Sequence, residues 1–292
     1  MQADSWTIQH VLSWITQDLA GRGVGSPRLD AELLVAEALR CDRIRLYMDL
    51  QQPMEPGELA AVRALVKRRR AREPIAYILG RREFYGRCFA VDRSVLIPRP
   101  ETESVVECAL ATLKRDSAAR VLDIATGSGA LAVTLAAERP HLQVDASDSS
   151  EAALRVARVN AGRHGVSQRM SFFAGDLFAP LPPDRAYAMI VCNPPYVSSE
   201  QWSALQPEIR LYEPREALLA ASGGLSFYER IVPAAARWLE PGGRLLLEVG
   251  AEQASRVVAM LRRHGAYDEP AVARDVGGRE RVVAARAAAA AP

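Results

Sequence analysis

Apolar residues recur with a helical period through the first quarter of the chain. Between residues 5 and 72 they return every three or four positions, which places them on one face of an α-helix. One such set is Val11, Leu12, Ile15 and Leu19. Glycines and prolines interrupt the pattern near residues 21–27 and 53–57, so this stretch predicts a small bundle of helices.

The pattern becomes extended at residues 84–97. Residues 84–91 and 95–97 are typical of two short strands, and Asp92-Arg93-Ser94 predicts the turn between them. We therefore expect a β-hairpin over residues 84–98 that joins a helical domain, residues 1–83, to a second domain. The helical domain has neither a glycine-rich loop nor a catalytic cluster, so we expect it to recognise the substrate.

Strand and helix patterns alternate from about residue 100. Strands are expected at residues 120–124, 142–146, 188–192 and 243–249, with helices at 129–138 and from 149 or 150 to 162–165. This alternation predicts a doubly wound α/β sheet over residues 99–283, with ligand sites beyond the carboxyl ends of the strands. The alanine-rich residues 284–292 are expected to form a low-complexity tail without a function.

The composition excludes several classes of protein. A chain of 292 residues that is 49% hydrophobic can bury a core, which excludes a disordered protein. The cysteines lie far apart and the histidines are dispersed, so we expect no disulfide framework and no metal site, and a cytoplasmic location. The cysteines are Cys41, Cys88, Cys108 and Cys192. No apolar run approaches the length of a membrane span, and the first 14 residues lack the basic region of a signal peptide.

Positive charge is concentrated in residues 60–93, which hold 10 basic and 3 acidic residues in a chain of net charge +2. The stretch is either a solvated helix face or a contact surface for an acidic partner or RNA. Among the 37 basic residues only Lys67 and Lys114 are lysine, which indicates a coding bias towards arginine. Arginine abundance is therefore weak support for nucleic-acid binding, and we expect none.

A glycine-rich loop follows the first strand of the predicted sheet. Gly127-x-Gly129-x-x-Ala132 fits the dinucleotide-binding fingerprint, and Asp148 lies at the end of the next strand. An acid at that position accepts hydrogen bonds from ribose hydroxyls. Both NAD and S-adenosylmethionine fit this layout, so the loop predicts a cofactor that contains adenosine without choosing between the two.

The tetrapeptide Asn193-Pro194-Pro195-Tyr196 follows the strand that ends at Cys192. A planar nitrogen is a poor nucleophile, so its N–H bonds must be held while its lone pair points at the methyl group. The Asn193 side-chain oxygen and the Pro194 carbonyl can accept those hydrogen bonds, and Tyr196 can stack on the flat group. The tetrapeptide favours N-methylation by S-adenosylmethionine, of either a glutamine amide or the exocyclic amine of adenine.

These motifs together resemble the protein-(glutamine-N5) methyltransferases that act on peptide chain release factors. The matching positions, in chain order, are residues 98–103, 126–129, Asp148, Gly175-Asp176, 193–196, Glu213-Pro214, Gly224-Leu225, 246–250, and Asp275 with Gly278. The resemblance covers nearly the whole chain. It implies a Rossmann-like class I methyltransferase sheet and methylation of the glutamine in the Gly-Gly-Gln motif of class 1 release factors, in support of translation termination. We expect the protein to be a monomer.

The resemblance also implies roles for individual residues. The cofactor-binding residues would be Ala125, Thr126, Gly127, Ser128 and Gly129 along the methionine part, Asp148 at the ribose, Asp176 and Leu177 at the adenine, and Asn193. The target glutamine would be held by Asn193, Pro194, Pro195 and Tyr196. Ala125 departs from the family, which usually has glycine there, and costs about 1 kcal/mol if the position requires positive φ.

Enzymes that act on two other substrates share the tetrapeptide. One is a glutamine of a large-subunit ribosomal protein, although residues 98–103 favour the release-factor type. The other is adenine in DNA, whose methyltransferases need a basic groove and a base-flipping platform. A binding module without catalysis is a third alternative. Glu101 and Glu103 are expected in the first turn of a helix that runs to Leu113, although a position near the cofactor is an alternative for them.

Overall fold

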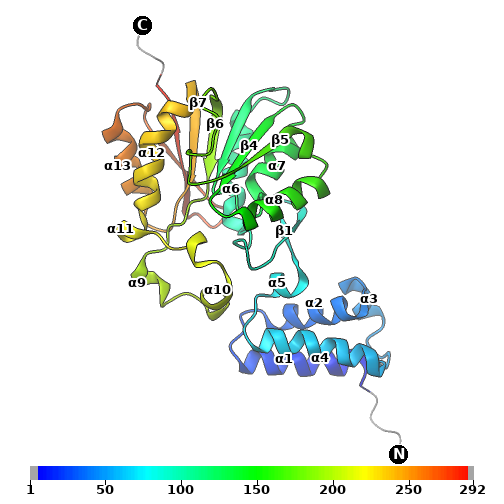
Figure 1. The fold of residues 1–292 in the computed structure, drawn as a ribbon. Coiled ribbons are helices and arrows are strands. Elements are labelled where there is room, and N and C mark those ends of the chain that lie inside the picture. Colours follow the sequence, from blue (N-terminus) through cyan, green and yellow to red (C-terminus); the bar gives the residue numbers. More distant parts are fainter. Residues whose placement is uncertain (1–5, 289–292) are drawn as a thin grey trace, which may run out of the picture. The chain divides into compact units, whose positions relative to one another are not determined.

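The chain divides into two compact units (Figure 1). The structure is a computed structural model and describes residues 6–288; the first five residues and residues 289–292 of the expected tail lie outside the described residues. The helical unit comprises the described residues up to Gly80 together with Gln206–Tyr212, and the sheet unit comprises Arg81–Leu205 and the described residues from Glu213 onward.

The helical unit is the bundle that the hydrophobic pattern predicts. Its helices are α1 (Ile8–Gly21), α2 (Pro27–Leu39), α3 (Arg43–Met48), α4 (Pro56–Arg70), α5 (Ile75–Leu79) and α10 (Pro207–Tyr212). The Thr7 side chain caps α1 by accepting a hydrogen bond from the His10 amide. Leu12, Ile15 and Leu19 have no exposed surface, so the predicted apolar face of α1 is the core face.

Buried ion pairs fasten α10 to this bundle. Arg69 Nε lies 2.7 Å from Asp30 Oδ2 of α2, and Arg69 Nη1 lies 2.9 Å from Glu208 Oε1 of α10. Arg72 adds a second contact to Glu208 at 2.8 Å, and the Tyr212 hydroxyl donates to the Ala71 carbonyl. Part of the basic stretch is therefore internal to the unit.

The sheet unit begins with a β-hairpin whose strands and turn lie earlier in the chain than predicted. Strands β1 (Arg81–Phe84) and β2 (Arg87–Ala90) pair antiparallel around Tyr85-Gly86. Both turn residues have positive φ, 50° and 67°, as a two-residue hairpin turn requires. The strand predicted at 95–97 is wrong, and the turn at residues 92–94 forms but joins no strands: Ile97 donates its amide to Glu213 Oε2 at 3.0 Å and pairs with no strand.

A seven-stranded sheet forms the centre of the unit, in the order β5-β4-β3-β6-β7-β9-β8. Its strands are β3 (Arg120–Ile124), β4 (Gln143–Asp148), β5 (Met170–Ala174), β6 (Tyr187–Cys192), β7 (Leu239–Glu248), β8 (Ala271–Arg274) and β9 (Glu280–Arg286). The first five strands in this order pair in parallel, which confirms the doubly wound sheet, and β8 and β9 are antiparallel additions that the pattern did not predict.

The tail predicted from residue 284 begins too early. Ala284, Ala285 and Arg286 belong to β9 and pair with Leu246, Leu245 and Arg244 of β7. Ala285 is buried in the core. The run of alanines resembles low-complexity sequence in composition, but small side chains fit a strand that is covered by helices.

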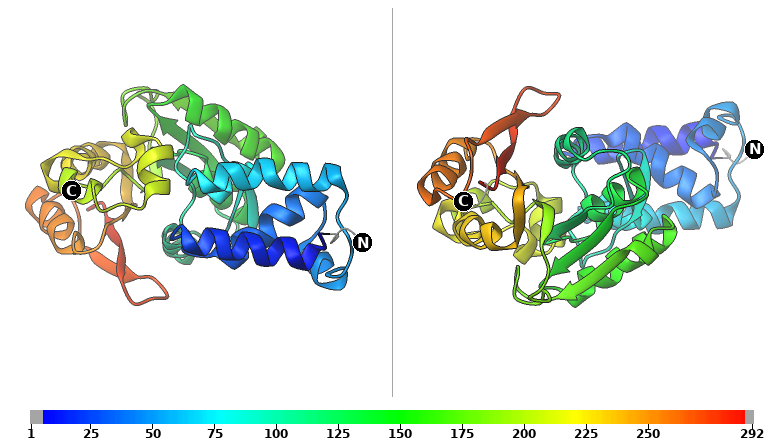
Figure 2. Two further views of the ribbon diagram at one scale, coloured as in Figure 1. Left: turned by 90° about the horizontal axis from the view of Figure 1, so that it is seen from below. Right: turned by 90° about the horizontal axis from the view of Figure 1, so that it is seen from above.

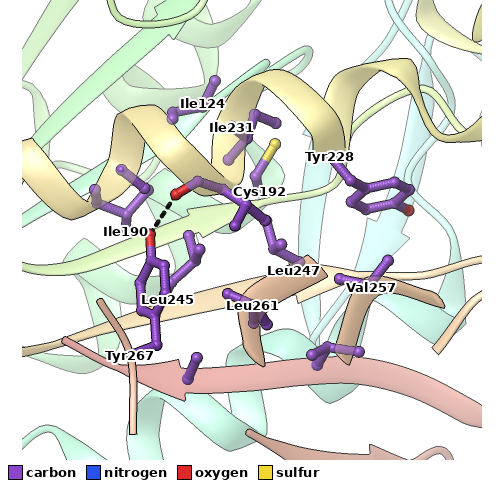
Figure 3. Close-up of a cluster of buried hydrophobic side chains, with 14 of the residues drawn as sticks. Ile124, Ile190, Cys192, Tyr228, Ile231, Leu245, Leu247, Val257, Leu261 and Tyr267 are labelled. Carbon is purple, nitrogen blue, oxygen red and sulfur yellow. Dashed lines mark hydrogen bonds between the residues drawn. The ribbon is translucent and has the colours of Figure 1, made fainter. Parts of the chain in front are cut away.

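Helices cover both faces of the sheet (Figures 1 and 2). On one face lie α6 (Glu103–Thr112), α7 (Ala130–Glu138) and α8 (Glu151–Arg163), and on the other α12 (Ser226–Trp238) and α13 (Ala254–His264). Figure 3 shows Ile190 and Cys192 of β6 in the hydrophobic core on the α12 and α13 face of the sheet, with Ile231 of α12. The intervening Met189 and Val191 belong to the opposite core, as strand alternation requires.

The remaining elements are short. They are η1 (Pro100–Thr102), η2 (Ser167–Arg169), α9 (Ser199–Trp202), η3 (Arg215–Ala217) and α11 (Ala221–Gly224). Glu101 lies in η1 and Glu103 begins α6, so the expectation of acids at this helix start is confirmed. Within residues 6–288 no helix has the length and apolarity needed to cross a membrane.

Candidate active site

Two adjoining cavities lie at the carboxyl ends of β3, β4 and β6, where an open parallel sheet holds its ligands. The larger encloses about 710 Å³ and the smaller about 400 Å³, each including space open to solvent. Leu96, Ala125, Gly127 and Asn193 line both. A small molecule that spans both cavities therefore passes Asn193.

The loop after β3 separates the two cavities. Gly127 and Gly129 have φ of 56° and 80°, which glycine adopts without strain. Ala125 has φ of 57°, so the position does require positive φ and alanine is strained there by about 1 kcal/mol. Gly129 lines neither cavity: a Cβ at this position would lie 3.2 Å from Ala157 Cβ, so the glycine permits close packing of α7 on α8.

Asp148 ends β4 and lines the larger cavity, as the sequence predicts for an acid at this point. Its Oδ2 accepts from the Gly127 amide and its Oδ1 accepts from the Ser150 amide, both at 2.9 Å. Burial raises the pKa of Asp148, and these two hydrogen bonds oppose the shift. The carboxylate therefore holds the glycine loop in place as well as facing the cavity.

Asp176 and Leu177 line the larger cavity beyond Asp148. Leu177 is buried and has a positive φ of 48°, which turns its side chain into the cavity wall. Asp176 is 60% exposed at the rim and its carboxylate pairs with Arg230. Both residues therefore line the larger cavity, and the resemblance implies a role for both at the adenine.

Thr126 and Ser128 line the smaller cavity. The Thr126 hydroxyl donates to Asp123 Oδ2 at 2.6 Å, and the Ser128 carbonyl accepts from Asn160 Nδ2 at 2.8 Å. These two bonds hold the Thr126 side chain and the Ser128 carbonyl in place beside the cavity.

Asp123, which the sequence analysis did not select, lies at the end of β3 and lines the smaller cavity. Its Oδ2 accepts from Thr126 and from the Ala132 amide, whereas its buried Oδ1 has no hydrogen-bond partner among the described residues. Burial raises the pKa of Asp123 to about 7, against those two hydrogen bonds. A buried acceptor without a partner beside a cavity is suited to a cationic ligand group. An acid at the end of the strand before the loop was the signal in the sequence.

Asn193 stands where the two cavities meet. Its Nδ2 donates to Thr102 Oγ1 at 3.1 Å, and this is the only hydrogen bond of the Asn193 side chain within residues 6–288. Pro194 and Pro195 are buried, and Pro195 adds to the wall of the larger cavity. The side-chain oxygen of Asn193 is therefore available to a ligand.

Tyr196 lines neither cavity. Its hydroxyl donates to Glu248 Oε1 at 3.4 Å, and its carbonyl accepts from Gln253 Nε2 at 3.0 Å. A Cβ on Gly224 would lie 2.4 Å from the Tyr196 carbonyl oxygen, so the glycine is needed for this close approach. Gly224, Glu248 and Gln253 together support the tetrapeptide from behind.

Glu213 braces the loop that forms the facing wall of the smaller cavity. Its Oε1 accepts from Arg99 Nη2 at 2.5 Å and its Oε2 accepts from the Ile97 amide at 3.0 Å. The Glu213 side chain is only 1% exposed. The sequence matches at residues 98–103 and at Glu213 are therefore two halves of one contact.

The described part of the chain holds no group of three or more histidine, cysteine or acidic residues that could bind a metal ion.

Comparisons with known proteins match both units. A family model described as the PrmC N-terminal domain matches residues 10–80, and one described as the methyltransferase small domain matches residues 105–227. A release factor glutamine methyltransferase from Geobacter sulfurreducens is 49% identical over 281 residues, which cover 96% of this chain and 97% of the relative. Another from Cereibacter sphaeroides is 43% identical over 272 residues, with 93% and 95% covered.

A solved structure supports the fold. A methyltransferase from Pyrococcus furiosus superposes with a TM-score of 0.53 at 17% identity, and covers 77% of this chain and 98% of its own. At that identity the likeness concerns the fold alone. With the family model and the strand order, it confirms the methyltransferase fold expected for the sheet unit.

Proposed function

Because the chain belongs to the release factor glutamine methyltransferase family, we propose that it methylates the side-chain amide nitrogen of the glutamine in the Gly-Gly-Gln motif of class 1 peptide chain release factors. The methyl donor is S-adenosylmethionine. Such a modification acts on the part of a release factor that ends translation.

The cavities fit the donor. Asp148, Asp176 and Leu177 would hold the adenosine part in the larger cavity, with Asp148 at the ribose hydroxyls. The methionine part would lie in the smaller cavity, where the unpartnered Asp123 Oδ1 suits its α-ammonium group. When bound, S-adenosylmethionine supplies a methyl group made electrophilic by the positively charged sulfur.

Asn193 would position the glutamine amide that accepts the methyl group. Its Oδ1 accepts one N–H of the glutamine amide and the Pro194 carbonyl accepts the other, which turns the nitrogen lone pair towards the methyl group. The two adjacent prolines limit the freedom of this loop. Tyr196, which lines neither cavity, would support the tetrapeptide through Glu248 and Gln253. The work of the site is orientation, with no charged base required.

One observation carries the proposal most strongly. Asn193 is the polar side chain common to both cavities, and its oxygen is left without a protein partner among the described residues. A planar N–H donor that reaches this oxygen lies next to whatever occupies the junction of the two cavities.

We assign recognition of the release factor to the helical unit. A groove between α1 and α4 is lined by Trp6, Trp14 and Leu59 and bordered by Arg63 and Arg70. Trp6 and Trp14 are 46% and 43% exposed, which is unusual for tryptophan and typical of a protein-binding surface. Changing Trp14 to Ala is expected to raise the KM for release factor with little change in kcat.

The substrate test compares three acceptors. Purified enzyme is given S-adenosylmethionine labelled in the methyl group, together with release factor, large ribosomal subunits or duplex DNA in separate reactions. We expect label in the release factor alone, and none in a release factor whose motif glutamine is changed to glutamate. Label in ribosomal protein or in DNA would reject the proposed substrate.

A further inference from the structure

Asn193 is the first member of a chain of polar side chains that leads away from the cavities. Its Nδ2 donates to Thr102 Oγ1 at 3.1 Å, and the Thr102 hydroxyl lies beside the Glu248 carboxylate and lowers its pKa. The Tyr196 hydroxyl donates to the same carboxylate at 3.4 Å. Thr102 is 4% exposed and Glu248 is fully buried, so water does not compete for these bonds.

The chemistry of the three groups fixes the direction of this chain. An ionised carboxylate only accepts hydrogen bonds, so beside Glu248 the Thr102 hydroxyl directs its single proton towards the carboxylate. The Thr102 oxygen is then left to accept, and the group of Asn193 that can donate to it is the amide NH₂. The opposite end of the amide, Oδ1, consequently faces the cavities.

We propose that Glu248 and Thr102 are positioning residues that determine which end of the Asn193 amide meets the substrate nitrogen. This inference rests on the proposed function and assigns residues to that same site. If Thr102 donated to Asn193 instead, the amide would turn and present N–H to the N–H of the glutamine. Two donors would then face each other, and the lone pair of the substrate nitrogen would lose its orientation.

The position of Glu248 supports a polar role over a packing role. Burial of a carboxylate costs free energy unless polar interactions with its neighbours compensate it. Its Oε2 lacks a hydrogen-bond partner among the described residues, and the ionisable groups around it include Arg281, Glu101, Tyr196, Tyr228 and Cys192. Burial raises the pKa of Glu248 to about 7, so the carboxylate is mostly ionised at about pH 8, the condition for the assay.

A matched set of variants separates orientation from packing. Thr102→Val removes the hydroxyl with little change of shape, Thr102→Ser restores it, and Glu248→Gln replaces an acceptor by a group that also donates. Each full-length variant is measured for kcat and KM on release factor at saturating cofactor, for affinity towards S-adenosylmethionine, and for melting temperature.

We expect Thr102→Val and Glu248→Gln each to lower kcat about 10- to 100-fold, since misorientation of one reacting group costs that much. The KM for release factor and the cofactor affinity should stay within about threefold, and Thr102→Ser should recover most of the lost kcat. The double variant Thr102→Val/Glu248→Gln should be no slower than the slower single variant, because both act through Asn193.

Three results would overturn the inference while the proposed function stands: wild-type kcat in a folded Thr102→Val variant, failure of Thr102→Ser to recover activity, or additive losses in the double variant. If the wild-type enzyme does not methylate release factor at all, the proposed function fails and takes this inference with it.

Discussion

A set of buried charges in the helical unit differs from two buried acids in the sheet unit. In the helical unit, buried Arg69 lies between Asp30 and Glu208, so each charge faces a partner. In the sheet unit, Asp123 and Glu248 are equally buried, yet each keeps one carboxylate oxygen without a hydrogen bond among the described residues. Burial raises the pKa of both to about 7.

The difference distinguishes buried charges that stabilise the fold from buried acceptors that are available to a ligand or a reacting group. Paired charges hold segments together, here α10 to the bundle. Buried acceptors without partners are a cost to stability, and they are tolerated where a ligand or a reacting group completes them. In the sheet unit they lie at the ends of β3 and β7, next to the tetrapeptide.

The largest expected effect comes from removing the charge at the centre of the helical unit. Arg69→Ala leaves the buried Asp30 without its ion-pair partner and leaves Glu208 with Arg72 alone, which is expected to cost about 3–5 kcal/mol of unfolding free energy. Denaturant unfolding measures the loss. Arg63→Ala, an exposed residue on the same helix, should change stability by about 0.5 kcal/mol or less. Equal effects of the two variants would show that the buried pairs are not structural.

The second prediction compares two buried aspartates of the sheet unit. Asp123→Asn removes the charge that we assign to the cofactor ammonium and is expected to weaken binding of S-adenosylmethionine about 10- to 100-fold by calorimetry. Asp145 is also buried, but Arg120 and the Tyr187 hydroxyl pair with it. Asp145→Asn should lower stability by about 1–3 kcal/mol and leave cofactor affinity unchanged. Unaltered affinity in the Asp123 variant would contradict the assignment.

The third prediction follows from the pKa of Asp123. Its folded value of about 7 lies above the unfolded value of about 3.9, so the folded protein binds this proton more tightly. Its contribution to stability is therefore present at low pH and is lost as the pH rises through about 7. Between about pH 5.5 and pH 7, wild type should lose about 2 kcal/mol relative to Asp123→Asn without cofactor. A constant difference across this range would refute the shift.

The smallest expected effect concerns the strained loop. Ala125→Gly relieves a positive φ and should raise the unfolding free energy by about 1 kcal/mol. Ala137→Gly, within α7, should lower it by about the same amount because glycine is a poor helix former. Destabilisation by both variants would mean that Ala125 is not strained.

Local patterns were enough to predict the helices of the bundle, α6 to α8, four of the five parallel strands and the loops that line the cavities, whereas β5, α12 and α13 were not predicted. The hairpin turn was misplaced because Asp92-Arg93-Ser94 does form a turn, but one that joins no strands, whereas Tyr85-Gly86 joins β1 to β2. The end of β9 was missed because its alanines acquire strand structure from pairing with β7.

The supporting residues of the site could not be predicted in the same way. Thr102, Asn193 and Glu248 lie far apart in the sequence and meet because β6 and β7 are neighbours in the sheet and η1 lies against their ends. The tetrapeptide shows which oxygen is needed, whereas the groups that aim this oxygen become visible in the fold.

We propose that the Asn193 oxygen orients a release-factor glutamine for methylation. The most direct measurement is mass spectrometry of release-factor peptides after incubation with cofactor and either wild-type enzyme or Asn193→Ala. We predict one methyl group on the glutamine of the Gly-Gly-Gln motif with wild type, and a rate lower by about 10²- to 10³-fold with Asn193→Ala at unchanged cofactor affinity. Methylation of that glutamine by Asn193→Ala at the wild-type rate would contradict the account.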